Sequence, residues 1–238
     1  MCGKASVIFG GSGFVGKHLL HNLRASHTGP LISFDLRDPV EGVRYMRADV
    51  RDLSSLRLDM DIGSIFNLAA THTTPGHMPW EYYATNVTGA TQIARFARRH
   101  DVHTICFTSS ISVYGPDETE KSETTVPAPV SDYGRSKVMA EQIFLDWQAE
   151  DARHRLSIAR PAVVFGHGEG GNFTRLTKML EKIPAALLKG AASALRQVSA
   201  AVLGVHPERI EKFMVSTNVR SQWAEAQGLE QSGGRPFV

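Results

Sequence analysis

The sequence contains few cysteines and no large excess of charge of either sign. Two of its 238 residues are cysteine, too few for a disulfide framework, and Cys106 lies in an apolar run typical of a strand. We therefore expect both thiols to be reduced. The formal net charge is only +2, which predicts neither a nucleic acid nor an acidic membrane surface as a partner.

The sequence also lacks a convincing membrane-spanning run. Residues 183–204 are apolar and rich in alanine, but Lys189 and Arg196 interrupt the stretch, and a proline and a glycine weaken it. We interpret it as a helix of a substrate lobe and expect no membrane contact. The first expected strand starts near Ala5, which leaves no room for a signal peptide, so we expect a cytoplasmic protein.

What the sequence does contain is a glycine-rich turn after its first expected strand. Residues 7–9 form an apolar run typical of a buried parallel strand, and a helical pattern follows the turn. Three glycines lie at intervals of three, although a second spacing that starts at Gly11 fits as well. Such glycines allow a sharp turn, a close approach of backbone N–H groups to a pyrophosphate and tight helix packing. The cofactor contacts expected here are Gly10, Gly13, Phe14, Val15 and Gly16.

An acidic residue ends the second expected strand, residues 31–35. The carboxylate of Asp35 can accept hydrogen bonds from both hydroxyls of an adenosine ribose, and it would repel a 2′-phosphate. This position favours NAD over NADP, although Arg37 works against that choice. The alternative is a glycine-rich turn without a ligand, with Asp35 as a helix cap.

The next two expected strands add candidate contacts to the cofactor. Asp49, after a short strand at residues 43–46, could meet the adenine amino group while Val50 packs on the ring. A turn or helix cap at Asp49 is an equally good interpretation. The fourth expected strand, residues 64–68, leads into small residues suited to a cofactor crossing the sheet edge: Leu68, Ala69 and Ala70.

A long helix is expected at residues 79–100. Asn86 lies in its middle, where asparagine is a poor helix former, which indicates a polar role such as buttressing the loop of a catalytic residue. A surface asparagine is the alternative. In the loop before this helix, His72 and His77 are expected to face solvent, since the sequence offers them no catalytic partner.

The chemistry is expected after the fifth strand, residues 103–108. That strand delivers Ser110, and a helix starting near residue 131 carries Tyr133 and Lys137, which fall on one face because they are one turn apart. A nearby ammonium group favours phenolate, so it should lower the pKa of Tyr133 toward a range useful for acid–base catalysis.

A sixth strand at residues 156–160, followed by Pro161 and Val163, completes an alternation of strands and helices. The alternation predicts an α/β fold with a doubly wound parallel sheet covered on both faces. We assign residues 1–171 to this cofactor-binding domain and residues 172–238 to a small, incomplete substrate lobe.

The ordered motifs resemble those of the extended short-chain dehydrogenase/reductases, and most closely the NAD-dependent epimerase/dehydratase group that acts on nucleotide sugars. The resemblance covers residues 5–171. It rests on six motifs: Gly10-Gly-Ser-Gly-Phe-Val-Gly16, Asn67-Leu-Ala-Ala70, Thr85-Asn-Val-Thr-Gly89, Ser109-Ser-Ile-Ser-Val-Tyr-Gly115, Tyr133-Gly-Arg-Ser-Lys137 and Arg160-Pro161.

The resemblance implies a Rossmann-like fold and NAD as cofactor, and we expect no metal site. It implies that Ser110 holds a sugar hydroxyl, that Tyr133 removes its proton, and that Lys137 binds the nicotinamide ribose and stabilises the phenolate. It also implies a UDP-linked substrate and a homodimer formed through residues 79–100 and 131–150. The cofactor contacts implied beyond the glycine turn are Asp35, Asp49, Val50, Leu68, Ala69, Ala70, Asn86, Tyr133, Lys137, Pro161 and Val163.

The sequence departs from the family pattern in two places. Ile111 and Ser112 stand where dehydratases carry an Asp-Glu pair and where decarboxylating members carry glutamate, so an epimerase or a ketoreductase is expected. A segment that family members normally have is missing between Lys182 and Ile183. A dehydrogenase of hydroxysteroids or aldehydes and a non-catalytic NAD sensor are the alternatives.

Overall fold

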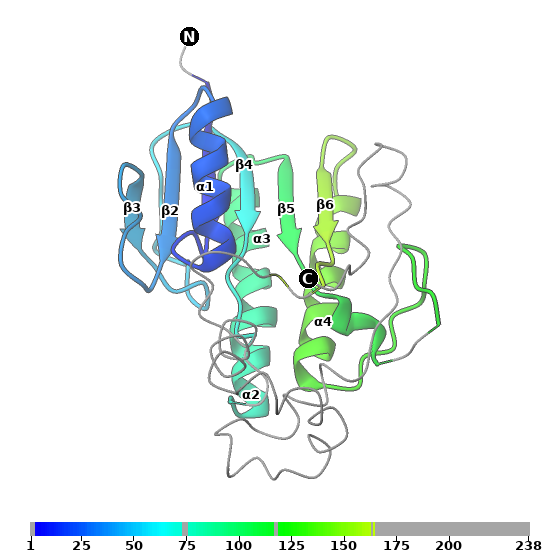
Figure 1. Cartoon of the computed structure of the whole chain (residues 1–238). Coiled ribbons are helices and arrows are strands. Elements are labelled where there is room, and N and C mark those ends of the chain that lie inside the picture. The colour runs from blue at the N-terminus through cyan, green and yellow to red at the C-terminus, as the bar shows by residue number, and fades with distance from the viewer. Residues whose placement is uncertain (1–2, 73–75, 117–118, 163, 165–238) are drawn as a thin grey trace, which may run out of the picture.

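In the computed structural model the described residues are 3–72, 76–116, 119–162 and 164, and they form a six-stranded parallel sheet (Figure 1). The strand order is β3-β2-β1-β4-β5-β6. The strands are β1 (Ala5–Phe9), β2 (Leu31–Asp35), β3 (Arg44–Arg47), β4 (Ile62–Asn67), β5 (Thr104–Thr108) and β6 (Arg155–Ala159). The helices are α1 (Phe14–Ser26), α2 (Pro79–Tyr82), α3 (Gly89–Arg99) and α4 (Asp132–Ala149), with a π-helical turn η1 (Tyr83–Thr88) and a 3₁₀ turn η2 (Ile111–Tyr114).

Helices cover both faces of the sheet, as expected for a doubly wound fold. Figure 1 shows α1 in front of the sheet and α3 and α4 behind it. In the core, the ring of Phe9 stacks on Phe34 at 5.3 Å and meets the edge of Phe96 at 5.7 Å. Burial of each large apolar side chain of this kind contributes roughly 1.5–3 kcal/mol to the free energy of folding. The Rossmann-like fold predicted from the sequence is confirmed.

The strand order reverses at β1, which has β2 and β3 on one side and β4, β5 and β6 on the other. The amide of Leu68, just past β4, donates to the carbonyl of Phe9 at 2.8 Å and holds the two ends together. In parallel α/β sheets, ligands bind at this kind of reversal. The glycine turn, the serine pair after β5 and the start of α4 all follow the carboxyl ends of strands.

Several local expectations differ from the structure. Loops, not helices, join β2 to β3 at residues 36–43 and β3 to β4 at residues 48–61. The expected single helix at residues 79–100 consists of α2, η1 and α3, because a π-helical turn interrupts it. Strand ends shift by one or two residues, within the usual range of assignment.

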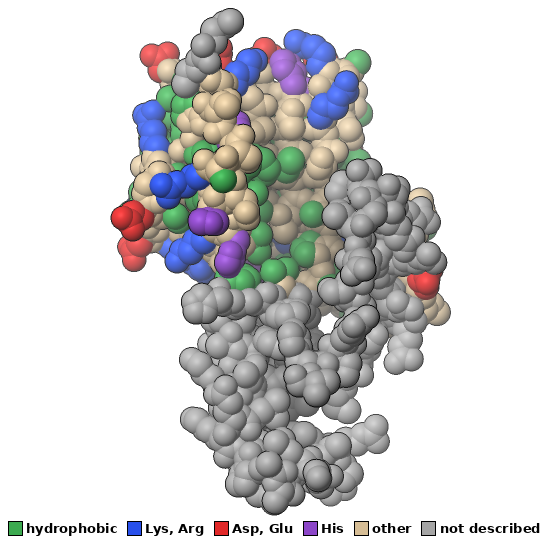
Figure 2. All heavy atoms as spheres, turned by 45° about the horizontal axis from the view of Figure 1, so that its top comes forward, with side chains coloured by type: hydrophobic (Ala, Val, Ile, Leu, Met, Phe, Trp, Pro, Cys, Tyr) green, Lys and Arg blue, Asp and Glu red, His purple; other side chains and the backbone are tan. Residues whose placement is uncertain are grey.

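The next expectations concern the cysteine in β5, membrane contact and the substrate lobe. Cys106 is a free, half-buried thiol whose pKa burial raises. No helix in the described residues is long and apolar enough to cross a membrane. The substrate lobe at residues 172–238, the apolar helix at 183–204 and the break between 182 and 183 lie outside the described residues. On the face shown in Figure 2, cationic and anionic side chains are interspersed around the top edge.

Candidate active site

The glycine turn between β1 and α1 combines a left-handed backbone with close packing. Gly10 has φ of 84°, and a Cβ there would lie 2.6 Å from the amide nitrogen of Ala69. A Cβ at Gly16 would lie 2.5 Å from the carbonyl oxygen of Gly10. The chain itself therefore requires glycine at both positions. Of the two spacings that the sequence allowed, the one starting at Gly10 carries the left-handed residue.

Gly13 is different, because the chain leaves the space around it open. A Cβ there would meet only the Gly10 carbonyl oxygen, at 3.3 Å. Gly13 caps α1 without a side-chain hydrogen bond, and the first-turn N–H groups at Phe14 and Val15 have no partner within the helix. A cradle of free N–H groups at the positive end of a helix fits a pyrophosphate. The residues present thus fit the phosphate part of a dinucleotide.

Asp35 ends β2 beside this turn. One carboxylate oxygen accepts a hydrogen bond from the amide of Ser12 at 2.9 Å, and the other accepts from the amide of Arg37 at 2.9 Å. These two bonds fix the carboxylate against the glycine turn, and each oxygen keeps a further lone pair for a ligand.

The residues after β3 and β4 lie at the same edge. The carboxylate of Asp49 accepts from the amide of Arg51 at 2.9 Å and pairs with its guanidinium at 2.5 Å, so its pKa is lowered. The turn alternative therefore describes Asp49, and no helix follows it. Val50 is buried, and a Cβ on Gly89 would lie 3.0 Å from its side chain. The three small residues after β4 are half-buried: Leu68, Ala69 and Ala70.

The predicted triad comes together at the start of α4. Ser110 caps η2, and Ser131 caps α4 by accepting from the amide of Gly134 at 3.1 Å. Lys137 is 2% exposed, and its ammonium donates to the carbonyl of Thr108, at the end of β5, at 2.9 Å. The structure thus brings the serine, tyrosine and lysine to one edge of the sheet.

The protonation of this triad is governed by burial. Burial lowers the pKa of Lys137 to about 7, and the charge of Glu141 opposes this shift. Burial also raises the pKa of the Tyr133 phenol, while a hydrogen bond with Ser110 lowers it. The net direction for Tyr133 is opposite to the one expected from sequence. The Lys137 ammonium lies 6.0 Å from the centroid of the Tyr133 ring and donates its hydrogen bond to the carbonyl of Thr108.

Asn86 lies inside η1 and is 3% exposed, so the surface alternative is wrong. Its amide oxygen accepts from the backbone of Thr71 at 3.0 Å, and its amide nitrogen donates to the Thr71 carbonyl and to Ser136. The Ser136 hydroxyl in turn donates to the carbonyl of Tyr133 at 2.8 Å. This network ties the loop after β4 to the first turn of α4, as the expected buttress would, and it leaves the amide no free donor for a cofactor.

Two tyrosines next to the site were not singled out from the sequence. Tyr82 is 4% exposed, and its ring lies 6.1 Å from that of Tyr133. The hydroxyl of Tyr83 donates to Asp132 at 2.9 Å and fixes the first turn of α4. Neither residue carries a local sequence signal, because each contact joins elements about fifty positions apart.

The remaining predicted positions have simple outcomes. Pro161 accepts a hydrogen bond from the amide of Ile111 at 3.1 Å and so lies beside the serine turn. Val163 lies outside the described residues. His72 and His77 are both exposed, and His77 lies 3.3 Å from the carboxylate of Glu81.

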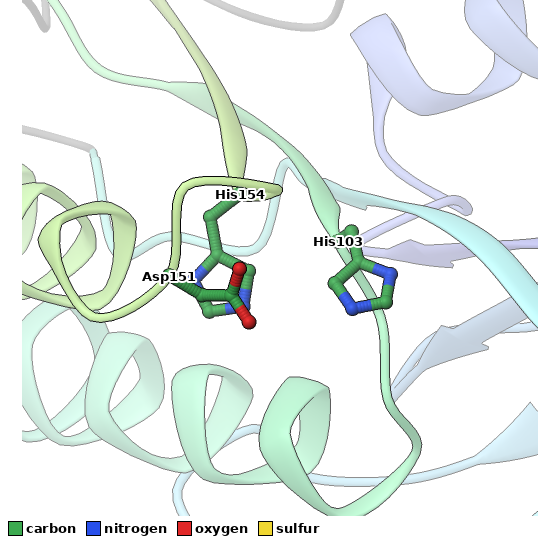
Figure 3. A group of neighbouring side chains, drawn as sticks. All are labelled: His103, Asp151 and His154. Carbon is green, nitrogen blue, oxygen red and sulfur yellow. The ribbon is translucent and has the colours of Figure 1, made fainter.

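A second group of titratable residues lies at the amino-terminal edge of the sheet. Potential ligand atoms of His103, Asp151 and His154 lie within 4.8 Å of one another (Figure 3). Asp151 accepts from the guanidinium of Arg153 through both oxygens, at 2.7 and 3.1 Å. Nδ1 of His154 donates to the carbonyl of Trp147 at 2.7 Å, and the two rings stack at 4.0 Å. We assign no ligand to this group, because the chain's own cation already occupies its carboxylate.

The chain is similar in sequence to several sugar epimerases. The N-acetyl-alpha-D-glucosaminyl-diphospho-ditrans,octacis-undecaprenol 4-epimerase of Escherichia coli O157:H7 is 29% identical over 182 residues, which are 73% of this chain and 53% of that protein. The UDP-glucose 4-epimerase of Neisseria meningitidis serogroup B is 29% identical over 187 residues, 71% of this chain and 55% of that protein.

A solved structure of MoeE5 in complex with UDP-glucuronic acid and NAD is 30% identical, with a TM-score of 0.60 over 75% of this chain and 60% of that chain. The chain spans about half the length of the curated relatives it matches. The model of the NAD dependent epimerase/dehydratase family matches residues 6–202. With the glycine turn and the Ser110, Tyr133 and Lys137 group in place, the chain belongs to the NAD dependent epimerase/dehydratase family.

Proposed function

We propose that the chain carries the cofactor-binding and catalytic half of an NAD-dependent epimerase that acts on a sugar hydroxyl of a nucleotide sugar. One observation carries the proposal: Tyr133 and Lys137 meet Ser110 at the sheet edge that also holds the open phosphate cradle. The 4-epimerases among the relatives support this choice over a reductase.

The cofactor would be held mainly by backbone and by one carboxylate. The pyrophosphate would lie on the amides of Phe14 and Val15 above Gly13, and the adenosine ribose would lie against Asp35. The acidic side chain favours NAD, and MoeE5 and several other neighbours were solved with NAD. Bound NAD would supply reversible hydride acceptance at its nicotinamide ring.

Tyr133 would act as the acid–base group. Ser110 would hold the sugar hydroxyl, and Tyr133 would take its proton and later return it. Because burial raises the pKa of Tyr133, its ionisation depends on a cation close by. Lys137 is that cation, and with a pKa of about 7 it changes charge near neutral pH.

The relatives differ in the group to which the sugar is linked. A UDP-linked substrate is expected from the resemblance and is supported by the UDP-glucose 4-epimerases. The Escherichia coli relative instead acts on a sugar linked through diphosphate to undecaprenol. Both carriers share the sugar diphosphate, so turnover assays with each, monitored by sugar composition of the product, separate them. Sterols and simple aldehydes test the dehydrogenase alternative, and lack of turnover with any substrate would favour the sensor.

The decisive experiment replaces Tyr133 with phenylalanine in the full chain. We expect epimerisation to fall by about 10³-fold, within the range of general acid–base catalysis, while NAD binding stays nearly unchanged. Tyr45→Phe is the matched control, because its hydroxyl, on β3, donates only to the backbone carbonyl of Asp35 at 3.0 Å. Full turnover in the Tyr133→Phe variant would overturn the mechanism, and full turnover in the control is expected.

A homodimer through α2, α3 and α4 is part of the same proposal. The guanidinium of Arg98 on α3 pairs with Glu150 at the end of α4, so the two helices form one joined surface. Met139 and Leu145 expose apolar side chains on α4. Light scattering of the full chain would test the dimer: a monomer at micromolar concentration contradicts it.

A further inference from the structure

A buried ion pair lies directly behind the triad. The guanidinium of Arg160, just past β6, donates to both carboxylate oxygens of Glu141 on α4, at 3.0 and 2.6 Å. The two side chains are 20% and 4% exposed. A forked pair of this kind is strong and geometrically specific, and removal of one partner leaves an uncompensated buried charge.

The Arg160 side chain is also held in place by Tyr114. It donates to the hydroxyl of Tyr114 at 2.7 Å, and its guanidinium carbon lies 5.1 Å from the centroid of that ring. The Tyr114 hydroxyl donates onward to the carbonyl of Ser122 at 2.8 Å. Because Tyr114 ends η2, which Ser110 caps, the pair joins the two elements that carry the triad, η2 and α4.

Glu141 follows Lys137 by four residues, so the two side chains lie on the same face of α4 one turn apart. Opposite charges at this spacing normally attract one another. Here both oxygens of Glu141 are taken by Arg160, and the Lys137 ammonium donates instead to the carbonyl of Thr108. That bond keeps the ammonium over the ring of Tyr133.

We propose that Arg160 is a positioning residue: by occupying both oxygens of Glu141, it keeps this carboxylate from drawing the Lys137 ammonium away from Tyr133. The proposal rests on the function proposed above, since it concerns how that site is kept ready. Without Arg160, the buried carboxylate of Glu141 has Lys137 as its nearest cation on the helix. The ammonium would then swing along α4 and leave the Thr108 carbonyl.

Other charged and titratable groups also face this region. Tyr82 on α2 lies against Tyr133 and raises its pKa. His72 lies in the loop after β4, close enough for the charge of Lys137 to act on it. None of these groups changes in the variants below, so a shift in the titration of Lys137 reports on Arg160 and Glu141.

The test is a double-mutant cycle of Arg160→Met and Glu141→Gln in the full chain. The readout is the titration of Lys137, followed by the NMR chemical shift of its ¹³Cε against pH and assigned with the Lys137→Met variant. We expect Arg160→Met to raise the pKa of Lys137 by about one unit, because its ammonium gains the Glu141 carboxylate as a partner, and to lower kcat roughly tenfold because the cation leaves Tyr133. In the Glu141→Gln background the same substitution should produce no shift beyond experimental error.

The cycle separates positioning from a purely structural role. A structural role would change the thermal midpoint but leave the titration of Lys137 unmoved, or would shift it equally in both backgrounds, and either result overturns the proposal. A crystal structure of Arg160→Met should place Nζ of Lys137 on Glu141, and Nζ still on Thr108 would contradict the proposal.

Arg160→Lys covers the case in which the methionine variant fails to fold. It keeps the charge but loses the two parallel hydrogen bonds, so a smaller rise in the pKa of Lys137 is expected, again only while Glu141 is present. No rise in this variant would overturn the proposal. Since the titration needs no substrate, a positive cycle without epimerisation would refute the proposed function alone.

Discussion

Titratable side chains lie at both the carboxyl and the amino edge of the sheet, but their charges are stabilised in different ways. At the carboxyl edge, the Lys137 ammonium is buried and its nearest partner is a neutral carbonyl. At the amino edge, Asp151 is solvated and binds the guanidinium of Arg153, two residues away. Burial shifts the pKa of Lys137 to about 7, whereas the neighbouring cation merely holds the pKa of Asp151 below its usual range.

This difference indicates where chemistry can occur. A group that a local ion pair satisfies keeps one charge state across the physiological range and has little left to offer a ligand. A buried group without a charged partner changes state near neutral pH and can exchange protons with a substrate. The carboxyl edge has that property, and it also has an open phosphate cradle.

The largest effect is expected at the phosphate cradle, which is formed by the amides of Phe14 and Val15 next to Gly13. Gly13→Val should weaken NAD binding by at least about 100-fold, or roughly 2.7 kcal/mol, because the branched side chain fills the space meant for the pyrophosphate. The fold should survive, since only the Gly10 carbonyl lies near the added Cβ. Isothermal titration calorimetry with NAD measures the loss. Gly16→Val is the control that should disrupt folding itself, because its Cβ meets backbone at 2.5 Å; unchanged NAD affinity in Gly13→Val would contradict the assignment of the cradle.

A second, intermediate effect concerns the pH dependence of stability. The pKa of Lys137 is about 7 in the folded chain and 10.5 ordinarily, so the unfolded chain binds one more proton between these values. The free energy of unfolding should therefore rise as pH increases from about 7 toward 10.5. Below about pH 7 both states bind the proton, so the slope due to this lysine should be zero. Urea unfolding at several pH values measures the slope.

The matched variant is Lys137→Met, which retains the apolar stem and removes the titration. The rise in stability with pH should flatten in this variant. An identical slope in both proteins would mean that the lysine is not the group responsible.

The smallest effect is expected at the amino edge. Asp151→Asn should leave NAD binding and turnover unchanged, and stability close to that of the parent, because exposed ion pairs contribute little. His154→Ala combined with His103→Ala should likewise leave turnover unchanged. Calorimetry with Zn²⁺ is the sharpest check: tight binding by the parent chain that this double variant loses would place a metal site where we assign none.

The architecture was predictable because its signals are local. Apolar runs of strand length alternate with helical patterns, and the glycine turn follows the first strand directly. The proximity of the three residues proposed as a triad was also predictable, since Tyr133 and Lys137 lie one turn apart and Ser110 follows a strand. These features depend on spacing within a few residues, which a sequence displays.

The rest depends on contacts between distant elements. Arg160 meets Glu141 nineteen positions away, and Asn86 meets Ser136 fifty positions away, so no periodicity marks either pair. The direction of the pKa shift at Tyr133 was missed for the same reason. Spacing placed the ammonium near the phenol, but the carbonyl of Thr108 takes its hydrogen bond and burial determines the sign.

The π-helical turn at Tyr83–Thr88 makes the exact number of residues in this helix important for the proposed site. A π turn accommodates one residue more than the regular helix on either side of it. Deletion of a single residue there would restore regular winding and rotate the side chains on one side of the deletion by about 100°. Asn86 would then turn away from Ser136, and an otherwise intact helix would lose its connection to Tyr133. This helix should therefore tolerate many substitutions on its exposed face, but no change in its number of residues.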